Sequence, residues 1–373
     1  MSHEKNTKHV FTILLLGLLM SLKVFSQLPT AQTVAGQMKV GWNLGNTLEA
    51  ICGENAWGNP TTSQTLINAV KAAGFNTVRI PCAWDCHATN GVIDANWLAR
   101  VKAVVDYCIS NQMYAIINIH WDGGWLENNV SLAKTDSVNA RQKAYWEQIA
   151  TAFRGFDEHV MFASANEPGC TDDATAKVLV SYHQTFINAV RSTGGKNAYR
   201  TLIIQGPDEF IRPGRYFPSD PTPDRLAYEF HNYSPTSFAI LDADPAEGGW
   251  GNILYYWGAG NHSTIEPIRN CTSGEEADQL DYYKKIKENY IDKGIPCVMG
   301  EYSANRRTAA SSHVPKELDK HNNSVDAWYT YLTKQCLAIG AKPFMWETGG
   351  VLDRTNNVVL DQRTVNAVMA GGK

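Results

Sequence analysis

The chain has 373 residues, of which 44% are apolar and 19% are charged, values typical of a globular protein with a sizeable core. Its net charge of -4 gives no electrostatic reason to expect nucleic acid or an anionic membrane as a partner. Eight cysteines are too few to form the disulfide scaffold that holds small secreted domains together.

The first residues have the pattern of a leader segment. Lys5 and Lys8 precede the apolar run Val10–Met20, which is short for a membrane span and typical of a secretory signal peptide. Residues 1–26 are therefore expected to be removed, which leaves Gln27 at the start of the mature protein. We expect export to the periplasm or the extracellular medium, with no membrane attachment after cleavage.

Short apolar runs alternate with longer amphipathic stretches along the rest of the chain. The runs predict strands at Lys39–Asn43, Thr77–Ile80, Tyr114–Ile119, Val160–Ala165, Thr201–Gln205, Leu226–Phe230, Pro296–Gly300 and Pro343–Trp346. The stretches predict helices at Ser63–Ala73, Ala95–Ser110, Ala140–Phe153, Thr175–Thr193, Glu275–Asp292 and Ser324–Ile339. Ser63 is a candidate N-cap of the first helix, and Gly74 is a candidate C-cap.

This alternation predicts the fold class. Strands that alternate with helices imply a parallel sheet with right-handed crossovers, and eight such units predict an α/β fold of the (β/α)8 TIM-barrel type. An open doubly wound sheet is the alternative, but GWNLGN after the first strand lacks the glycine spacing of a phosphate loop. No linker or repeat divides residues 27–373, which are therefore expected to form one domain.

Two segments are candidates for the walls of an active face, because they follow the fifth and sixth predicted strands. Loops at the C-terminal ends of barrel strands surround the active site in this type of fold. The segment Phe210–Arg225 is rich in proline and glycine, and Leu241–Cys271 carries four aromatic rings, those of Trp250, Tyr255, Tyr256 and Trp257.

Polar and aromatic side chains follow six of the predicted strands, at the end where barrels carry their chemistry. Glu167 follows the fourth strand and Glu301 the seventh. The remaining candidates for binding a substrate are Arg79, His120, Trp121, Asn166, His231, Tyr233 and Trp346. Each alone has an ordinary structural explanation, such as a buried histidine or a salt-bridge anchor, but their shared position favours a joint chemical role.

The two glutamates suit the hydrolysis of a β-glycosidic bond with retention of configuration. That reaction needs a nucleophilic carboxylate about 5 Å from a carboxylic acid that protonates the leaving oxygen. Glu301 is expected to be the ionised nucleophile, supported by Arg79 and Tyr233. Glu167 is expected to be the proton donor, kept protonated by a dry site and a nearby carboxylate, with Asn166 beside it to bind a sugar hydroxyl. Trp346 would stack on the sugar, and the histidines would orient hydroxyls or carboxylates.

The cysteines give little support to a metal centre. Cys82, Cys86 and His87 lie close in sequence, but a fourth ligand is missing. The strand ends lack the clustered acidic or His-x-His ligands of a metal-dependent hydrolase, so we expect neither a metal nor another cofactor. Cys108, Cys297 and Cys336 lie in apolar patterns and are expected to be buried thiols.

The order of seven segments resembles glycoside hydrolase family 5, and most of all its bacterial endoglucanase branches. The segments are GWNLGNTLEA, NTVRIP, INIHWDGGWLEN, FASANEP, EFHNYSP, VMGEYSA and PFMWETGG, and the resemblance extends from about Val34 to the C-terminus. The resemblance implies Glu167 as acid/base, Glu301 as nucleophile, and the other strand-end residues as active-site positions. One departure follows Trp346, where related endoglucanases often have Asp and this chain has Glu347.

Three functions are open at this point. The first is a secreted, retaining endo-β-1,4-glucanase (a cellulase), and the second is a β-mannanase, glucomannanase or xyloglucanase on the same barrel. The third, a non-catalytic glycan-binding barrel, predicts that one of the two glutamates has been replaced, and neither has. The expected partner is a β-1,4-linked polysaccharide bound by a monomer. No carbohydrate-binding module is evident, so binding to crystalline cellulose is expected to be weak.

Overall fold

The protein is described by a computed structural model over residues 27–244 and 251–373, so the expected signal peptide and Trp250 lie outside the described residues. Eight parallel strands close into a barrel in the order β1-β10-β9-β8-β7-β6-β5-β2. They are β1 (Gly41–Asn43), β2 (Thr77–Ile80), β5 (Tyr114–Asn118), β6 (Val160–Ala163), β7 (Leu202–Gln205), β8 (Leu226–His231), β9 (Cys297–Tyr302) and β10 (Lys342–Met345). Because β1 pairs with both β2 and β10, the barrel prediction is confirmed and the open sheet was wrong.

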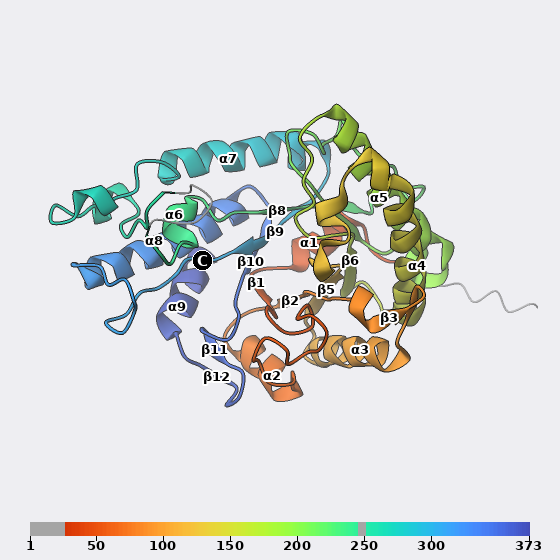
Figure 1. Cartoon of the computed structure of the whole chain (residues 1–373), viewed down its shortest axis with the longest axis horizontal. Coiled ribbons are helices and arrows are strands. Elements are labelled where there is room, and N and C mark those ends of the chain that lie inside the picture. The colour runs from red at the N-terminus through yellow and green to blue at the C-terminus, as the bar shows by residue number, and fades with distance from the viewer. Residues whose placement is uncertain (1–26, 245–250) are drawn as a thin grey trace, which may run out of the picture.

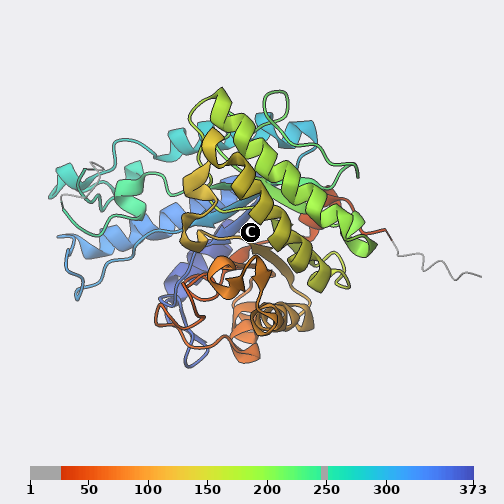
Figure 2. The ribbon, with the colours of Figure 1, turned by 45° about the vertical axis from the view of Figure 1, so that its right-hand side comes forward.

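Helices surround this barrel on its outside, with β8, β9 and β10 visible at the centre of the view (Figure 1). They are α1 (Ala31–Gln37), α2 (Gln64–Ala72), α3 (Ala95–Ser110), α4 (Thr135–Phe153), α5 (Asp173–Ser192), α6 (Thr236–Ala239), α7 (Glu276–Asn289), α8 (Leu318–Ala338) and α9 (Gln362–Gly371). Figure 2 shows α4 and α5 packed side by side along one flank. Among the described helices, none is both long and apolar enough to cross a bilayer.

Two short antiparallel hairpins lie outside the barrel, and the sequence patterns did not predict them. One pairs β3 (Ala88–Thr89) with β4 (Val92–Ile93), and the other pairs β11 (Leu352–Asp353) with β12 (Val358–Val359). Strands of two residues are too short to show an alternating pattern, so only the turn residues between them could have indicated a hairpin.

The helix boundaries agree best with prediction where a capping residue marks them. The side-chain oxygen of Ser63 accepts a hydrogen bond from the Leu66 amide at 3.1 Å, which confirms it as the N-cap of α2. Ala73 is the C-cap, one residue earlier than predicted, and Gly74 follows it with a φ of +108°. By contrast, α4 and α8 begin five and six residues before their predicted starts, because their polar first turns carry no apolar periodicity.

Helix α1, which the sequence patterns did not predict, closes the N-terminal end of the barrel. Val34 and Met38 belong to the same buried cluster as Ile116 and Phe344, which come from the barrel strands. The side chain of Asn76, immediately before β2, accepts a hydrogen bond from the Lys39 amide at 2.8 Å, which holds the chain after α1 at this end. The opposite end, where the strands finish, is left for the functional site.

The pairing of β9 with its neighbours is irregular beside Glu301. In the register with β8, Phe230 faces Met299 while the next residue, His231, faces Glu301, so Gly300 has no partner and forms a bulge. Bulges beside active sites re-aim the side chain that follows them. Gly300 is also required for space, because a Cβ at this position would overlap the carboxylate of Glu229.

Cys82, Cys86 and His87, which lie close together in the sequence, have different surroundings in the structure. Cys82 is buried and its thiol donates to the carbonyl oxygen of Ile80, whereas Cys86 is exposed. The ring of His87 stacks on Trp97, with centroids 3.6 Å apart. Buried thiols at three positions are confirmed, namely Cys108, Cys297 and Cys336.

Candidate active site

Arg79, near the C-terminal end of β2, contacts more members of the polar cluster at the mouth of the barrel than its neighbours do. Its guanidinium is fully buried and donates to Glu301 Oε1 at 2.8 Å, Asn166 Oδ1 at 2.9 Å and Asn43 Oδ1 at 3.0 Å. Its Nε forms an ion pair with Glu229 at 2.9 Å. Burial alone would lower the pKa of Arg79, but the charges of Glu229 and Glu301 outweigh it and raise the pKa. Arg79 therefore stays charged and holds residues from several strands in register.

Glu301, which β9 carries past the bulge, is surrounded by donors. Besides Arg79 on Oε1, the hydroxyl of Tyr233 donates to Oε2 at 2.7 Å. Burial and then the charge of Glu301 raise the pKa of Tyr233 well above its ordinary value, so this hydroxyl keeps its proton. Only 5% of the residue is exposed to solvent. A cationic donor on one oxygen and a neutral donor on the other therefore hold this carboxylate in place.

Glu167 differs from Glu301 in exposure and in backbone geometry. It follows β6, its side chain is 52% exposed, and its φ of +43° lies in the left-handed region. Its amide donates to Gln205 Oε1 at 2.7 Å, which supports this strained conformation. The hydrogen bond from His231 lowers the pKa of Glu167, although burial opposes the shift. The expectation that a dry site keeps Glu167 protonated is therefore wrong for the arrangement in the structure.

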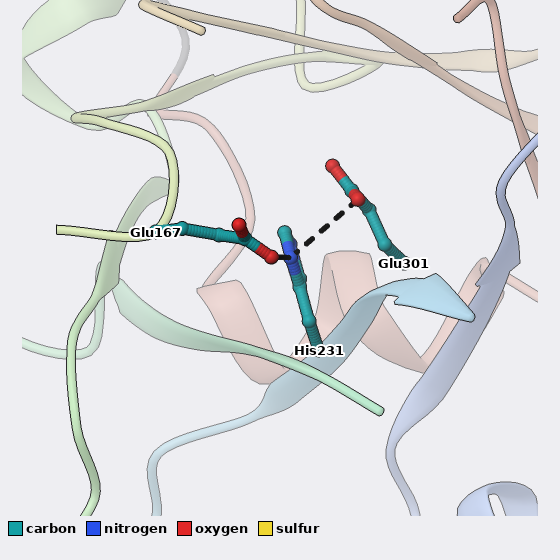
Figure 3. Close-up of side chains that lie close together, drawn as sticks. All are labelled: Glu167, His231 and Glu301. Carbon is teal, nitrogen blue, oxygen red and sulfur yellow. Dashed lines mark hydrogen bonds and ion pairs between the residues drawn. The ribbon is translucent and has the colours of Figure 1, made fainter. Parts of the chain in front are cut away.

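His231, at the end of β8, lies between the two glutamates, and Figure 3 shows its imidazole between their carboxyl groups. Nδ1 is 2.7 Å from Glu167 Oε1 and 3.6 Å from Glu301 Oε2, while Nε2 is 3.0 Å from Glu229 Oε1. Burial disfavours a charge on this ring, but Glu301, Glu167 and Glu229 together raise the pKa of His231 to about 9. His231 is therefore an imidazolium at neutral pH.

Aromatic rings flank the carboxylates. His120 and Trp346 are stacked with centroids 5.5 Å apart and planes 7° from parallel. Burial, then the positive charge of Arg79, lowers the pKa of His120 well below its ordinary value, so this ring is neutral. Trp121 is 40% exposed and Trp57 is 44% exposed, and the centroids of their rings lie 6.3 Å apart. Flat, accessible rings beside a polar cluster are suited to stacking on sugar rings.

Four residues of this region were missed by the sequence reasoning. Glu229 is a fully buried carboxylate inside β8, and Gln205 ends β7. Trp57 comes from a loop after β1 that shows no periodic pattern. Glu127, in a single turn after β5, has a pKa raised to about 7, first by burial and then by the charge of Glu167, and its Oε2 has no hydrogen-bond partner among the described residues. The one available signal was the charged residue of EFHNY, in a strand predicted to be buried.

A cavity of about 830 Å³ opens beside Glu167 and Glu301. Its wall is made by residues after β8, β9 and β10, including Ile240, Asn305, Thr308, Trp346, Val351 and Leu360. The segment Phe210–Arg225 does not line this cavity, and Tyr255, Tyr256 and Trp257 are buried in the core. None of the described residues of the two segments expected to wall the active face lines this cavity, and their role in shaping the substrate site stays a prediction.

Glu347, the departure noted in the sequence, has a structural role in the loop after β10. Its carboxylate forms a buried ion pair with Arg354 at 3.0 Å. It also accepts hydrogen bonds from the backbone amides of Gly349 at 2.5 Å and Val351 at 2.9 Å. The longer side chain of Glu therefore holds the loop that supports Trp346.

The carboxylates and the imidazole at the barrel mouth have the composition of a possible cation site. One atom each from Glu167, His231 and Glu301 lie within 4.8 Å of one another, and this is the one such cluster in the described ranges. Metal binding requires a deprotonated imidazole nitrogen. The pKa of about 9 keeps a proton on His231 Nδ1, so a cation would have to displace that proton at neutral pH.

Comparisons with known proteins agree on one family. Residues 35–350 match the family model described as cellulase (glycosyl hydrolase family 5). A xyloglucan-specific endo-β-1,4-glucanase of Bacteroides ovatus is 32% identical over 92% of this chain and 70% of its own length. Endoglucanase A of Paenibacillus barcinonensis is 32% identical over 92% of this chain and 90% of its own. A xyloglucan-specific β-1,4-glucanase from a ruminal metagenomic library, solved in complex with XXLG, superposes with a TM-score of 0.81 at 38% identity, over 92% of this chain and 96% of that one.

Proposed function

The chain belongs to glycosyl hydrolase family 5, and from that premise we propose that it is a retaining endo-β-1,4-glucanase, which hydrolyses internal bonds of its polymer by double displacement. Family membership makes it a glycoside hydrolase, and its relatives support β-1,4-glucans as the substrate class. The observation that carries the mechanism is the spacing of the two glutamates. Their nearest oxygens lie within 4.8 Å, which suits the carboxyl separation of about 5 Å in retaining enzymes rather than the wider gap of inverting ones.

In the first step Glu301 attacks the anomeric carbon of the sugar while Glu167 gives its proton to the leaving oxygen. Arg79 and Tyr233 donate to the two oxygens of Glu301 and orient it for this attack. A new bond joins the anomeric carbon to the Glu301 oxygen, the glycosidic bond breaks, and the leaving chain departs as an alcohol.

In the second step Glu167, now a carboxylate, takes a proton from a water molecule whose oxygen attacks the anomeric carbon. The bond to Glu301 breaks, and Glu301 leaves as a carboxylate. The sugar is released with its original configuration, and Glu167 is again protonated.

A xyloglucanase is the second candidate for the specificity of the same site. A volume of about 830 Å³ is near the upper end of the range for small-molecule sites, about 300–1,000 Å³, and leaves room for sugars that branch from a glucan backbone. It adjoins Trp346, the candidate stacking surface, so a branch could enter it while the backbone occupies the catalytic cluster. The Bacteroides ovatus relative is described as specific for xyloglucan, which supports this candidate.

Hydrolysis of carboxymethyl-cellulose, xyloglucan, glucomannan and galactomannan should be compared at equal mass concentration. We expect cleavage of the two glucans with a rapid fall in viscosity, and the ratio of their rates distinguishes the two candidates. Glu301→Gln should abolish turnover on all of them and preserve binding. Much faster hydrolysis of galactomannan than of either glucan would contradict the proposed specificity, and full activity of Glu301→Gln would contradict the mechanism.

We further propose that the protein is exported and acts outside the cytoplasm as a monomer. The apolar run Val10–Met20 after Lys5 and Lys8 supports export, since residues 1–26 have the features of a signal peptide. N-terminal sequencing of the protein secreted by its native host should begin at or near Gln27. Recovery of the unprocessed chain from the cytoplasm would contradict export.

A further inference from the structure

The environment of His231 has a feature that the double-displacement mechanism leaves unused, namely a carboxylate at each ring nitrogen. Glu167 Oε1 lies 2.7 Å from Nδ1 and Glu229 Oε1 lies 3.0 Å from Nε2. An ionised carboxylate only accepts hydrogen bonds, so both nitrogens must carry protons for both contacts to form. Because the lowered pKa of Glu167 favours its ionised form, the ring then carries a second proton in addition to the one that a neutral imidazole has.

Glu229 is built into the barrel wall so that its charge persists. It is fully buried, and its Oε1 also contacts Arg79 Nε at 2.9 Å. Burial opposes ionisation of Glu229, yet Arg79 and then His231 lower its pKa. Gly300 leaves the space that its carboxylate occupies, because a side chain at position 300 would overlap it. Glu229 has no exposed surface and does not line the 830 Å³ cavity, so we assign it no direct contact with substrate.

Other charged and titratable groups also face His231, from several elements. Glu301 from β9 favours the charged ring and Arg79 from β2 opposes it. Glu127, from the turn after β5, has a pKa raised by burial, which the charge of His231 partly opposes. The pKa of His120, after β5, is lowered by burial, then by Arg79 and then by the charge of His231. Tyr282 from α7 contacts only the backbone carbonyl of His231, at 3.5 Å. Among these, Glu229 is the one that fixes Nε2.

We propose that Glu229 is a positioning residue that makes His231 the proton store for the acid/base Glu167, and this inference rests on the proposed function. Glu229 holds a proton on Nε2, so the proton that can move is the one on Nδ1. When substrate covers Glu167 and excludes water, the charged carboxylate is disfavoured. The Nδ1 proton then passes along the 2.7 Å hydrogen bond to Oε1. His231 becomes neutral with its Nε2–H still donated to Glu229, and Glu167 becomes the carboxylic acid that the first step needs.

The store is available only below the pKa of His231, about 9. Above that pH the ring is neutral, Glu167 has no proton to receive, and glycosylation of substrates with poor leaving groups should fail. The pH at which activity on natural oligosaccharides falls on the alkaline side therefore depends on the pKa of His231. Because the charge of Glu229 affects that pKa, it also depends on Glu229. Substrates whose leaving groups need no proton should not show this dependence.

The first test compares Glu229→Gln with the unmodified full chain. We expect the alkaline limb of kcat/KM on cellooligosaccharides to move about 1–3 pH units lower, the shift produced by losing one opposite charge nearby. The value of kcat/KM on an aryl β-cellobioside with an activated phenol leaving group should change little. Glu229→Asp, which keeps the negative charge, should leave the alkaline limb closer to its position in the unmodified protein. An unchanged limb, or an equal loss on both substrates at every pH, would overturn the proposal.

Glu54→Gln is a matched control, because Glu54 is also a buried glutamate paired with an arginine. Its Oε2 lies 2.7 Å from Arg100 Nε, and neither residue belongs to the catalytic cluster. This variant should leave the pH profile unchanged. A shift as large as that of Glu229→Gln would show that loss of any buried charge moves the limb and would overturn the proposal.

A second measurement uses only the unmodified protein, without substrate, so it does not depend on whether a variant folds. The ring protons of His231 in the unmodified protein, assigned by NMR, should titrate well above neutral pH and show both nitrogens protonated at pH 7. A neutral ring at pH 7 would overturn the proton store. Failure of the unmodified protein to cleave any β-1,4-glucan would instead contradict the proposed function, and this titration distinguishes the two failures.

Discussion

Two glutamates of the same chemical type differ here in their hydrogen-bond partners. Glu301 accepts from Arg79 and Tyr233, is almost completely buried, and keeps one fixed orientation. Glu167 is half exposed and accepts from an imidazolium that can return a proton to it. A buried carboxylate held by two donors suits a nucleophile, whereas an exposed one with an exchangeable proton suits a general acid and base.

Replacement of Glu167 by Ala tests this division of roles. On cellooligosaccharides we expect kcat/KM to fall by roughly 10²–10⁴-fold, the usual contribution of general acid–base catalysis. On an aryl cellobioside with an activated leaving group kcat/KM should fall much less, because that leaving group departs without a proton. Steady-state kinetics on both substrates gives the comparison. Equal losses on the two would show that Glu167 does not act as the acid.

The positions of the candidate site residues were largely predictable, because strand ends of a barrel meet at one mouth. Arg79, Asn166, His231 and Tyr233 all contact a neighbouring predicted residue there. Glu229 was not predictable as a functional residue, since a charged side chain inside a strand does not reveal which face it occupies. The protonation of Glu167 was predicted wrongly because it depends on the hydrogen bond from His231, which sequence does not show.

At the scale of elements, the bulge in β9 positions Glu301 and leaves room for the carboxylate of Glu229. Gly300 lies opposite no residue of β8, and the space beside it is filled by the carboxylate of Glu229. The barrel strands were predictable because buried apolar runs are distinctive. Helix α1 was not, since seven residues with small and polar side chains show little periodicity. The bulge depends on register between strands, which a single strand pattern does not contain.

Gly300→Ala tests the requirement for space at the bulge. The added methyl group would push Glu229 away from Arg79 and His231, so we expect the free energy of unfolding to fall by about 1–3 kcal/mol, as for overpacking in a core. Gly36→Ala on α1 is the control, because a Cβ there meets no atom within 4 Å. It should be neutral or stabilising by up to about 1 kcal/mol. Urea denaturation measures both, and equal stability of the two variants would contradict the role of Gly300.

At the scale of the whole molecule, the two ends of the barrel have different tasks. Helix α1 packs with Ile116 and Phe344 at the N-terminal end. The opposite end brings β6 and β9 close enough for Glu167 and Glu301 to share one imidazole (Figure 3). Closure of the barrel thus brings two glutamates 134 positions apart in sequence to the same imidazole, 301 minus 167 being 134.

The most direct test of this account is to trap the covalent intermediate. A 2-deoxy-2-fluoro-cellobioside with an activated leaving group should form the bond to the enzyme and slow its hydrolysis, because fluorine destabilises both transition states. Mass spectrometry of the intact protein should show one added glycosyl unit, and peptide sequencing should place it on Glu301. Glu301→Gln should remain unlabelled. Labelling at Glu167 or elsewhere, or release of product with inverted configuration and no adduct, would contradict the central claim.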